Sequence, residues 1–329
     1  MRPSEFDLIG RYFAPLSADF PGAVNLQDDL ATFSPAAGHE LAVTVDAMVA
    51  GVHFLPTDPP ELIARKLLRV NLSDLAASGA RPLCYLLAIS LDASLDEDWV
   101  RAFAGGLAHD QKQFGIALAG GDTTATPGPL SLSLTAIGEI PRGRAVRRSG
   151  AAVGDDIWLS GTVGDAALAL TLMERDGLAA LEAEYPDLLS RYRLPEPRTL
   201  LGPALIGLAK AMADVSDGLL ADLGHICTGS GAGARIVFAD LPLSEPVKTL
   251  FERTPDKKDE YVQRVLTGGD DYELVFTAAP SASAEIEQSA IRCGTQVTRI
   301  GRVEQAPGVR PVAFDGTEIA VTVGGWRHF

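Results

Sequence analysis

The chain has 329 residues, enough for two domains that each enclose a hydrophobic core. Its hydrophobic content of 47% and charged content of 22% are ordinary for a globular protein and exclude wholesale disorder. The net charge of −15 argues against nucleic acid or an anionic membrane as the main partner. It does not exclude small phosphate ligands, provided that a cation mediates their binding.

Two further features indicate the cellular setting. No stretch approaches the roughly 18 consecutive apolar residues of a membrane helix, and the first residues, "MRPSEFDLIGRYF", lack the basic-then-apolar order of a signal peptide. The three cysteines, Cys84, Cys227 and Cys293, are widely separated and form no CxxC pair. We therefore expect a cytoplasmic protein with reduced thiols and no membrane partner.

The first half alternates strand-like and helix-like patterns, which favours an α/β or α+β class. Expected strands cover residues 39–49, ending near Asp46, then 83–91 and 130–140. A short strand that runs into a glycine turn is expected within 116–124, and a short apolar strand after Asp29. Expected helices cover residues 59–82, with proline at the start and Gly79 and Pro82 at the stop, and 96–115.

A basic stretch then marks a change of domain. "PRGRAVRRSGAAVGDD" gathers four arginines between proline and glycines, and it places the predicted boundary between residues 148 and 149. The domains are thus predicted as 1–148 and 149–329, each a mixed β-sheet flanked by helices. In the second domain we expect a strand, a glycine turn and a helix in 156–172, then strands near 234–243, 271–278, 295–303 and 318–323.

The stretch "AMADVSDGLLADLGHI", residues 211–226, carries three aspartates and no lysine or arginine. Its apolar spacing predicts an amphipathic helix from Val215, preceded by Asp214 and with Ser216 and Asp217 in its first turn. Taken alone, these residues fit helix capping.

Aspartates recur at the ends of other predicted elements. Thr44 and Asp46 are two apart on a strand and should share a face; Asn71, Asp74 and Ser78 form a polar stripe on a helix. Each site alone fits a turn or cap. The remaining acidic sites are Asp28 and Asp29, Asp122 at the end of a strand, and Asp270 and Asp271.

Clustered carboxylates could not persist beside a polyphosphate without cations, because like charges about 4 Å apart cost on the order of 4 kcal/mol at an effective dielectric of about 20. Hard oxygen ligands without a sulfur or imidazole set select Mg²⁺. The chain has no GxxxxGK[ST], HExxH or GxSxG motif. The pattern predicts a cleft in which acidic side chains from both halves of the chain bind magnesium ions, and the magnesium ions bind phosphates.

The ordered motifs "DDLATF", "VTVDAMVAGVHF", "VNLSDLAASGARP", "LAGGDTT", "RRSGA", "DVSDGLLADLGHI", "GGDDYELVFT" and "WRHF" resemble the thiamine-monophosphate kinase family. That family belongs to the aminoimidazole-ribonucleotide-synthetase-like superfamily. The resemblance implies transfer of the ATP γ-phosphate to thiamine monophosphate, the last step of thiamine diphosphate synthesis, with Mg²⁺. It also implies a homodimer paired through the N-terminal domains.

Site residues follow from the same resemblance. No general base or covalent nucleophile is expected, and Asp28, Asp222 and Asp271 are interpreted as caps or supporting groups. The implied magnesium ligands are Asp29, Thr44, Asp46, Asp74, Asp122, Asp214 and Asp217; the implied ATP contacts are Gly121, Asp122, Arg148 and Ser216; the implied thiamine monophosphate contacts are His53, Asp270 and Trp326.

Other interpretations stay open at this point. His53 also fits a packed surface histidine, the arginines fit a solvated loop, and "SGTVGD" (160–165) has the context of an anion-binding turn. Aminoimidazole ribonucleotide synthetase is the nearest enzymatic rival, and a non-catalytic metal- or nucleotide-binding regulator is the rival of another class. The sequence departs from the family pattern at Gln27, where glycine is usual, and at Val45, where a hydroxyl residue is usual.

Overall fold

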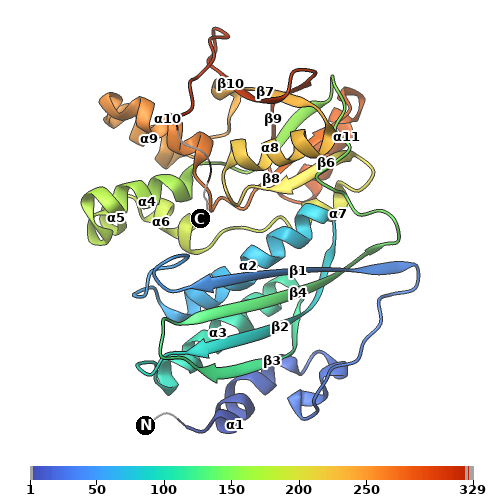
Figure 1. Ribbon diagram of the computed structural model, residues 1–329, viewed down its shortest axis with the longest axis vertical. Helices are drawn as coiled ribbons and strands as arrows, with labels where there is room; N and C mark the ends of the chain where they lie inside the picture. Colours follow the sequence, from blue (N-terminus) through green and yellow to red (C-terminus); the bar gives the residue numbers. More distant parts are fainter. Residues whose placement is uncertain (1–2, 323–324, 326–329) are drawn as a thin grey trace. The chain divides into compact units, whose positions relative to one another are not determined.

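The computed structural model describes residues 3–322 and 325, and it divides into two compact units (Figure 1). The first unit comprises the described residues up to Leu75 together with Ala80–Gly143, and the second comprises Ala76–Gly79 and the described residues from Arg144 onward. Each unit contains one mixed sheet with helices, as the sequence predicted.

The first unit is built on a sheet of four strands in the order β1-β4-β2-β3. Only the β2–β3 pair is parallel. The strands are β1 (His39–Val49), β2 (Arg81–Leu91), β3 (Ala117–Ala125) and β4 (Ser131–Pro141), and the long helices are α2 (Pro60–Ser78) and α3 (Glu97–Phe114). Short helical turns precede the sheet: α1 (Glu5–Leu8), η1 (Ile9–Phe13), η2 (Ala14–Ser17) and η3 (Pro21–Leu26).

Three expectations for this unit were wrong in detail. Strand β1 does not end near Asp46 but pairs with β4 up to Val49, and β3 continues past Asp122 to Ala125 because β2 remains its partner that far. The residues after Asp29 form no strand. Gln27 has φ −98° and ψ −3°, which any residue can adopt, so this position does not need the family's glycine.

The two faces of the first sheet differ in character. Thr44 and Asp46 share a face, as predicted, and that face turns toward α2, whose side chains bond to them. On the opposite face, Leu41, Val43 and Val45 are 39%, 64% and 60% exposed. A strand whose outward residues are apolar is unusual on a solvated surface.

The second unit is built on six strands in the order β10-β7-β9-β5-β8-β6. Only the β10–β7 pair is parallel. The strands are β5 (Asp156–Ser160), β6 (Ala209–Asp214), β7 (Gly233–Val237), β8 (Leu274–Ala278), β9 (Val297–Glu304) and β10 (Gly308–Val312). The helices are α4 (Asp165–Asp176), α5 (Leu178–Glu184), α6 (Pro186–Arg193), α7 (Leu201–Ala204), α8 (Leu219–Ser230), α9 (Glu245–Arg253), α10 (Lys258–Thr267) and α11 (Ser283–Arg292).

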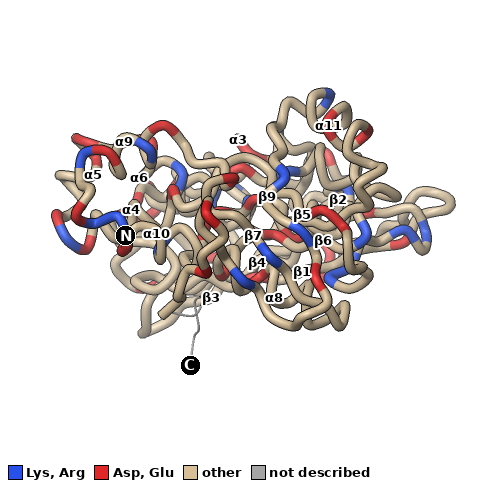
Figure 2. The backbone as a smooth tube through the Cα atoms, turned by 90° about the horizontal axis from the view of Figure 1, so that it is seen from above, with Lys and Arg blue, Asp and Glu red and all other residues tan. Residues whose placement is uncertain are grey.

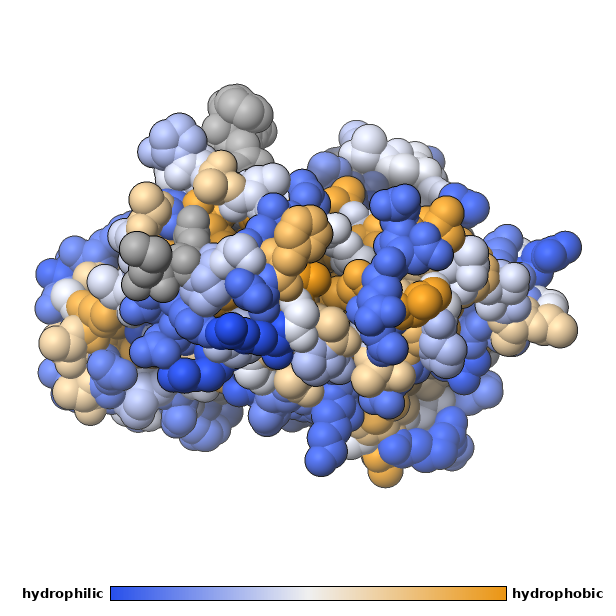
Figure 3. All heavy atoms as spheres, turned by 90° about the horizontal axis from the view of Figure 1, so that it is seen from below, coloured by the Kyte–Doolittle hydropathy of each residue, from blue (hydrophilic) through white to orange (hydrophobic). Residues whose placement is uncertain are grey.

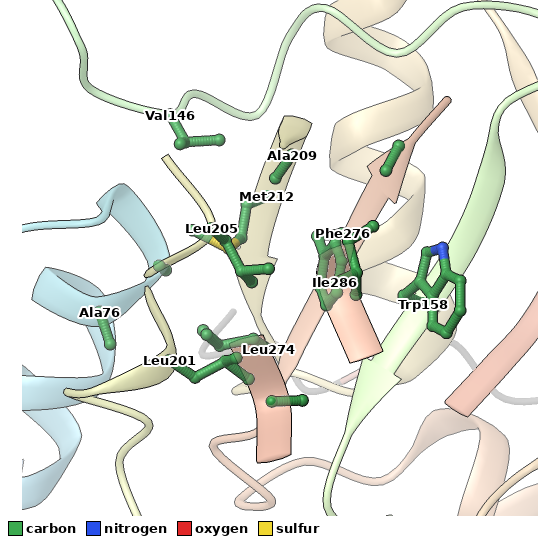
Figure 4. Close-up of a cluster of buried hydrophobic side chains, with 13 residues drawn as sticks. Ala76, Val146, Trp158, Leu201, Leu205, Ala209, Met212, Leu274, Phe276 and Ile286 are labelled. Atoms are coloured by element: carbon green, nitrogen blue, oxygen red, sulfur yellow. The ribbon is translucent and has the colours of Figure 1, made fainter. Parts of the chain in front are cut away.

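One face of this sheet is closed by an apolar cluster (Figure 4). Trp158 of β5 and Phe276 of β8 lie in near-parallel planes, 11° apart, with their ring centroids separated by 6.4 Å. Ile286 of α11 and Met212 of β6 pack in the same cluster. These buried side chains join β5, β8 and the edge strand β6 to α11 in one apolar cluster.

Two expectations for the second unit were also wrong. The helix predicted from Val215 begins only at Leu219, and the residues before Val215 form strand β6. The final strand predicted over 318–323 is reduced, within its described residues, to an isolated bridge at Glu318, because Ile319 bonds to Pro311 and Thr322 to Gln263.

Acidic and basic residues are mixed along the second-unit helix α9, whereas the charged residues of α5 are acidic (Figure 2). The face drawn in Figure 3 carries hydrophobic side chains beside hydrophilic ones. No helix among the described residues is long and apolar enough to cross a membrane.

Candidate active site

The turn between β6 and α8 is organised by one buried carboxylate. Asp222, in the first turn of α8, accepts hydrogen bonds at its Oδ2 atom from the backbone N–H groups of Ser216, Asp217 and Gly218, at 3.0, 3.0 and 3.1 Å. Ser216 and Asp217 therefore lie in the turn before the helix, not in its first turn as predicted. Asp222 serves as a cap, in agreement with its interpretation from the sequence.

Strand-like pairing delays the start of the helix. The N–H of Val215 donates to the carbonyl of Glu273, and the N–H of Tyr272 donates to the carbonyl of Val215, both at 2.8 Å. Gly218 then turns the chain at φ 126°, where a Cβ atom would lie 2.5 Å from the Thr267 carbonyl oxygen. Only glycine fits such a position. Apolar spacing alone could not reveal this pairing.

The same turn holds a small cluster of possible metal ligands. One ligand atom from each of Asp217, Asp222 and His225 lies within 4.8 Å of the others. Burial, followed by the negative charge of Asp217, raises the pKa of Asp222 to about 7, although its bonds to backbone N–H groups oppose the shift. His225 was missed from the sequence; its position one helical turn after Asp222 was the available signal.

The segment before β8 runs alongside this turn. The N–H of Asp270 donates to the Ser216 carbonyl at 3.0 Å, and a Cβ atom on Gly269 would lie 2.1 Å from the same oxygen. Asp270 has φ 68°, an uncommon conformation for a residue other than glycine. The structure thus brings Asp270 beside Ser216.

Arg148 belongs to the same region. The carbonyl of its neighbour Arg147 accepts the N–H of Met212 at 2.9 Å, which holds this segment along β6. The positive charge of Arg148 acts to lower the pKa of Asp222. Arg148 is exposed, so its guanidinium is accessible to a ligand.

Two acidic residues beneath the turn are structural. Glu273 is fully buried; Arg198 Nε and Ser160 Oγ both donate to its Oε2 atom at 2.6 Å, and Arg191 donates to Oε1 at 2.9 Å. Asp271 is also buried, which raises its pKa well above the usual value, and accepts the N–H of Gly164 at 2.9 Å. In the "SGTVGD" turn, the N–H group of Gly164 therefore already binds an anion from within the protein, the Asp271 carboxylate.

In the first unit, β1 and α2 bring three predicted ligands together. Thr44 Oγ1 donates to Asp74 Oδ2 at 2.6 Å, and the N–H of Asp46 donates to Asn71 Oδ1 at 3.1 Å. Asn71 is fully buried and donates in turn to the carbonyl of Leu67 at 2.9 Å, which fixes its orientation. The polar stripe predicted on this helix thus faces the strand that carries Thr44 and Asp46.

A cavity of about 520 Å³ lies elsewhere in the same unit, lined by the N-terminal turns and by β2 and β3. Asp29, Gly121 and Asp122 are all among its lining residues. A Cβ atom on Gly121 would lie 1.9 Å from the Leu87 carbonyl oxygen, so this close approach of β3 to β2 requires glycine. Asp28 Oδ1 accepts the N–H of Asp29 at 2.9 Å, consistent with a capping role.

Not all of the predicted ligands of this unit meet. Asp46 pairs in register with Leu134 on β4, whereas Asp122 lies in the row of Ala88 on β2 and Ser133 on β4. Adjacent rows point to opposite faces, and β1 and β3 are the two edges of the sheet. Within one chain, Asp46 and Asp122 therefore face opposite sides of this sheet.

Two predicted substrate contacts remain. His53 is half-buried, and its Nδ1 atom accepts the N–H of Val49 at 3.0 Å, which leaves Nε2 as the ring nitrogen directed away from that turn. Trp326 lies outside the described residues.

Two family models define the class of the protein. Residues 27–140 match the N-terminal domain of AIR synthase related proteins, and residues 152–313 match the C-terminal domain of the same proteins. The fold and the acidic turns described above are therefore those of an AIR synthase-related protein.

Full-length relatives narrow the class. The chain is 41% identical to the thiamine-monophosphate kinase of Caulobacter vibrioides over 99% of its own length and 91% of that protein. A crystal structure of thiamine-monophosphate kinase from Stenotrophomonas maltophilia K279a is 44% identical, with a TM-score of 0.85, over 97% of this chain and 99% of that one. The chain belongs to the thiamine-monophosphate kinase family, and its enzymatic class is thiamine-phosphate kinase.

A third relative carries ligands. The solved complex of AaThiL with AMPPCP and TMP is 31% identical, with a TM-score of 0.76, over 100% of this chain and 99% of that one.

Proposed function

We propose that this kinase transfers the γ-phosphate of ATP directly to the phosphate of thiamine monophosphate, yielding thiamine diphosphate and ADP. The observation that carries the proposal is the meeting of Asp29 with Gly121 and Asp122 in one cavity, since these residues come from two motifs that are distant in the sequence. The complex of AaThiL with AMPPCP and TMP supports both substrates.

The oxygen ligands suit magnesium. Among the residues that the structure describes, no ion pair involves Asp29, Asp122 or Asp217, so these carboxylates lack a protein cation. Uncompensated carboxylates beside phosphates favour a hard divalent cation. The proposed ligands are Asp29, Thr44, Asp46, Asp74, Asp122, Asp214 and Asp217. Bound Mg²⁺ would neutralise charge that develops on the transferred phosphoryl group.

The other proposed contacts orient the substrates. Gly121, Asp122, Arg148 and Ser216 are assigned to ATP, and His53, Asp270 and Trp326 to thiamine monophosphate. Arg148 supplies the guanidinium that phosphate oxygens bind best. The backbone of β3 at Gly121 is exposed and so is accessible to a ligand.

No catalytic base is proposed. The second pKa of a phosphate monoester is near 6, so the attacking oxygen is already ionised at neutral pH. The protein's task is then to align two anions for a single in-line displacement. A reaction with isotopically chiral γ-phosphate should invert the configuration at phosphorus; retention would contradict a single displacement.

A homodimer is part of the proposal. The open face of the first sheet exposes Leu41, Val43 and Val45 on β1 and Leu86 on β2, which is 39% exposed. Asp122 lies on that same face, in the row of Ala47. Pairing of two such faces would remove apolar surface from water and bring a second copy close to Asp122.

The activity is tested by ADP release from ATP. Release should require thiamine monophosphate, should be absent with thiamine, and should stop when a chelator removes Mg²⁺. ADP release that continues without thiamine monophosphate, or in excess chelator, would contradict the proposal.

A further inference from the structure

Three arginines form a row across neighbouring strands at one side of the second sheet. Arg302 of β9 pairs in register with Arg235 of β7, and Arg235 pairs in register with Arg310 of β10. Arg299 lies on β9 near the same row. The side chains of Arg299, Arg302 and Arg310 are 61%, 59% and 41% exposed. Figure 2 shows Lys and Arg segments close together on this part of the chain.

The local acidic groups only partly balance these charges. Asp156 is the acidic partner of Arg299 and Arg302, but its Oδ1 atom lies 3.8 and 3.6 Å from their guanidinium nitrogens, beyond ordinary hydrogen-bond length. The Oδ2 atom of Asp156 is buried and has no hydrogen-bond partner among the described residues. Two guanidinium groups therefore share one weakly engaged carboxylate.

At the far end of the row, Glu304 forms a direct ion pair with Arg310, although the Nε atom of Arg310 is buried without a hydrogen-bond partner in the described part of the chain. Arg235 forms no ion pair with a described residue. The neighbouring carboxylate of Asp315 instead accepts the N–H of Thr317 at 2.9 Å. Four guanidinium groups thus lie near three carboxylates, Asp156, Glu304 and Asp315, a local excess of one positive charge in a chain of net charge −15.

Such a row is unfavourable for folding by itself. Like charges directly opposite one another on adjacent strands destabilise a sheet, and strands are about 4.8 Å apart, so the three guanidinium groups span roughly 10 Å. An anion with several charged oxygens over that length would relieve the repulsion. Guanidinium groups bind phosphate oxygens through paired hydrogen bonds.

We propose that this row of Arg302, Arg235 and Arg310, together with the adjacent Arg299, is a second binding site that takes the di- or triphosphate group of a small molecule without a metal ion. Its short span suits an oligophosphate better than a nucleic acid, which would need a longer basic surface. The site is independent of the proposed catalytic residues, none of which lies on β7, β9 or β10.

A chelator distinguishes the proposed arginine site from the proposed magnesium site. Carboxylates need Mg²⁺ to hold a polyphosphate, whereas arginines do not, so calorimetric titration is done in excess EDTA. Inorganic tripolyphosphate, ADP and thiamine diphosphate are titrated in turn, which shows whether the bare oligophosphate suffices or a nucleoside or thiamine portion adds affinity. We expect at least one of them to bind the wild-type protein, and the doubly substituted R235Q/R302Q protein to bind it at least about tenfold more weakly.

The matched control is Arg253→Gln, which removes one exposed arginine of α9 that also has a single acidic partner, Glu184. It should bind the oligophosphates as the wild type does. In EDTA, the absence of binding to the wild-type protein, or equal binding by the wild type and R235Q/R302Q, would overturn the proposal. Thermal unfolding of R235Q/R302Q at low salt, expected at or above the wild-type midpoint, checks that a loss of affinity is not a loss of fold.

Discussion

The backbone N–H of Asp217 donates a 3.0 Å hydrogen bond to the buried Oδ2 atom of Asp222, five residues further along the chain. The same oxygen receives the N–H groups on either side of Asp217, so one carboxylate fixes the turn that presents Ser216 and Asp217. Asp222 thereby orients Asp217, which is proposed to bind a cation, and Asp222 itself need not touch the substrates.

Replacing Asp222 by alanine should loosen this turn. Leaving the buried N–H groups without an acceptor costs about 1–3 kcal/mol of unfolding free energy. We also expect the Mg²⁺ concentration for half-maximal activity to rise severalfold, because Asp217 loses its fixed orientation. The matched control is Glu245→Gln, in the exposed first turn of α9. A destabilised Asp222→Ala enzyme with an unchanged Mg²⁺ requirement would show that Asp222 is structural only.

Asp222 also predicts a pH dependence. Its pKa is about 7 in the folded protein, because of burial and then the charge of Asp217, against 3.8 when exposed. Between these values the folded state binds more protons than the unfolded state, so stability falls as pH rises toward 7 and levels off above it. The slope can reach about 1.4 kcal/mol per pH unit.

The measurement is urea unfolding without Mg²⁺ from pH 5 to 8. The stability advantage of the wild type over Asp222→Asn should shrink as pH approaches 7, since asparagine does not titrate. Parallel stability curves for the two proteins would exclude this titration.

Asp46→Asn tests the proposed metal set of the first unit. The substitution keeps the size of the side chain, and the N–H of residue 46 can still bond to Asn71. We expect kcat to fall by at least about a hundredfold while the thermal midpoint changes little. Asp98→Asn, at a 73% exposed side chain in the first turn of α3, should retain full activity. Wild-type turnover by Asp46→Asn would remove Asp46 from the ligand set.

The buried carboxylate of Glu273 predicts a large effect on stability. Replacing it with glutamine leaves Arg191 and Arg198, which are 23% and 16% exposed, without their negative partner. Breaking such a buried pair costs about 3–5 kcal/mol in denaturant unfolding. Glu182→Gln removes the exposed partner of Arg193, at 3.8 Å, and should change stability by less than about 1 kcal/mol. Similar losses in both proteins would contradict a structural role specific to Glu273.

The dimer proposal is tested at the open face of the first sheet. Val45→Glu places a charge among the exposed apolar residues of β1, so sedimentation should show a monomer where the wild type sediments as a dimer. Phe314→Glu, at an 89% exposed residue of the second unit, should leave the sedimentation unchanged. A wild-type protein that sediments as a monomer would remove the dimer from the proposal.

The amino-acid sequence by itself determined the class of fold, most of the strands and the family. Alternating apolar residues on 39–49 and helical spacing on 60–78 follow from local geometry, so β1 and α2 could be predicted from their own residues. The separate aspartate motifs could be recognised because glycine, aspartate and proline each constrain the backbone near them.

The tertiary structure decided which of those residues meet. Val215 pairs with residues near 273, more than fifty positions away, and that pairing moved the start of α8 to Leu219. Strand register likewise placed Asp46 and Asp122 on opposite faces of one sheet, and it aligned Arg302, Arg235 and Arg310 in one row. Local spacing gives the face of a residue on its own strand, but long-range hydrogen bonding decides which residue lies beside it.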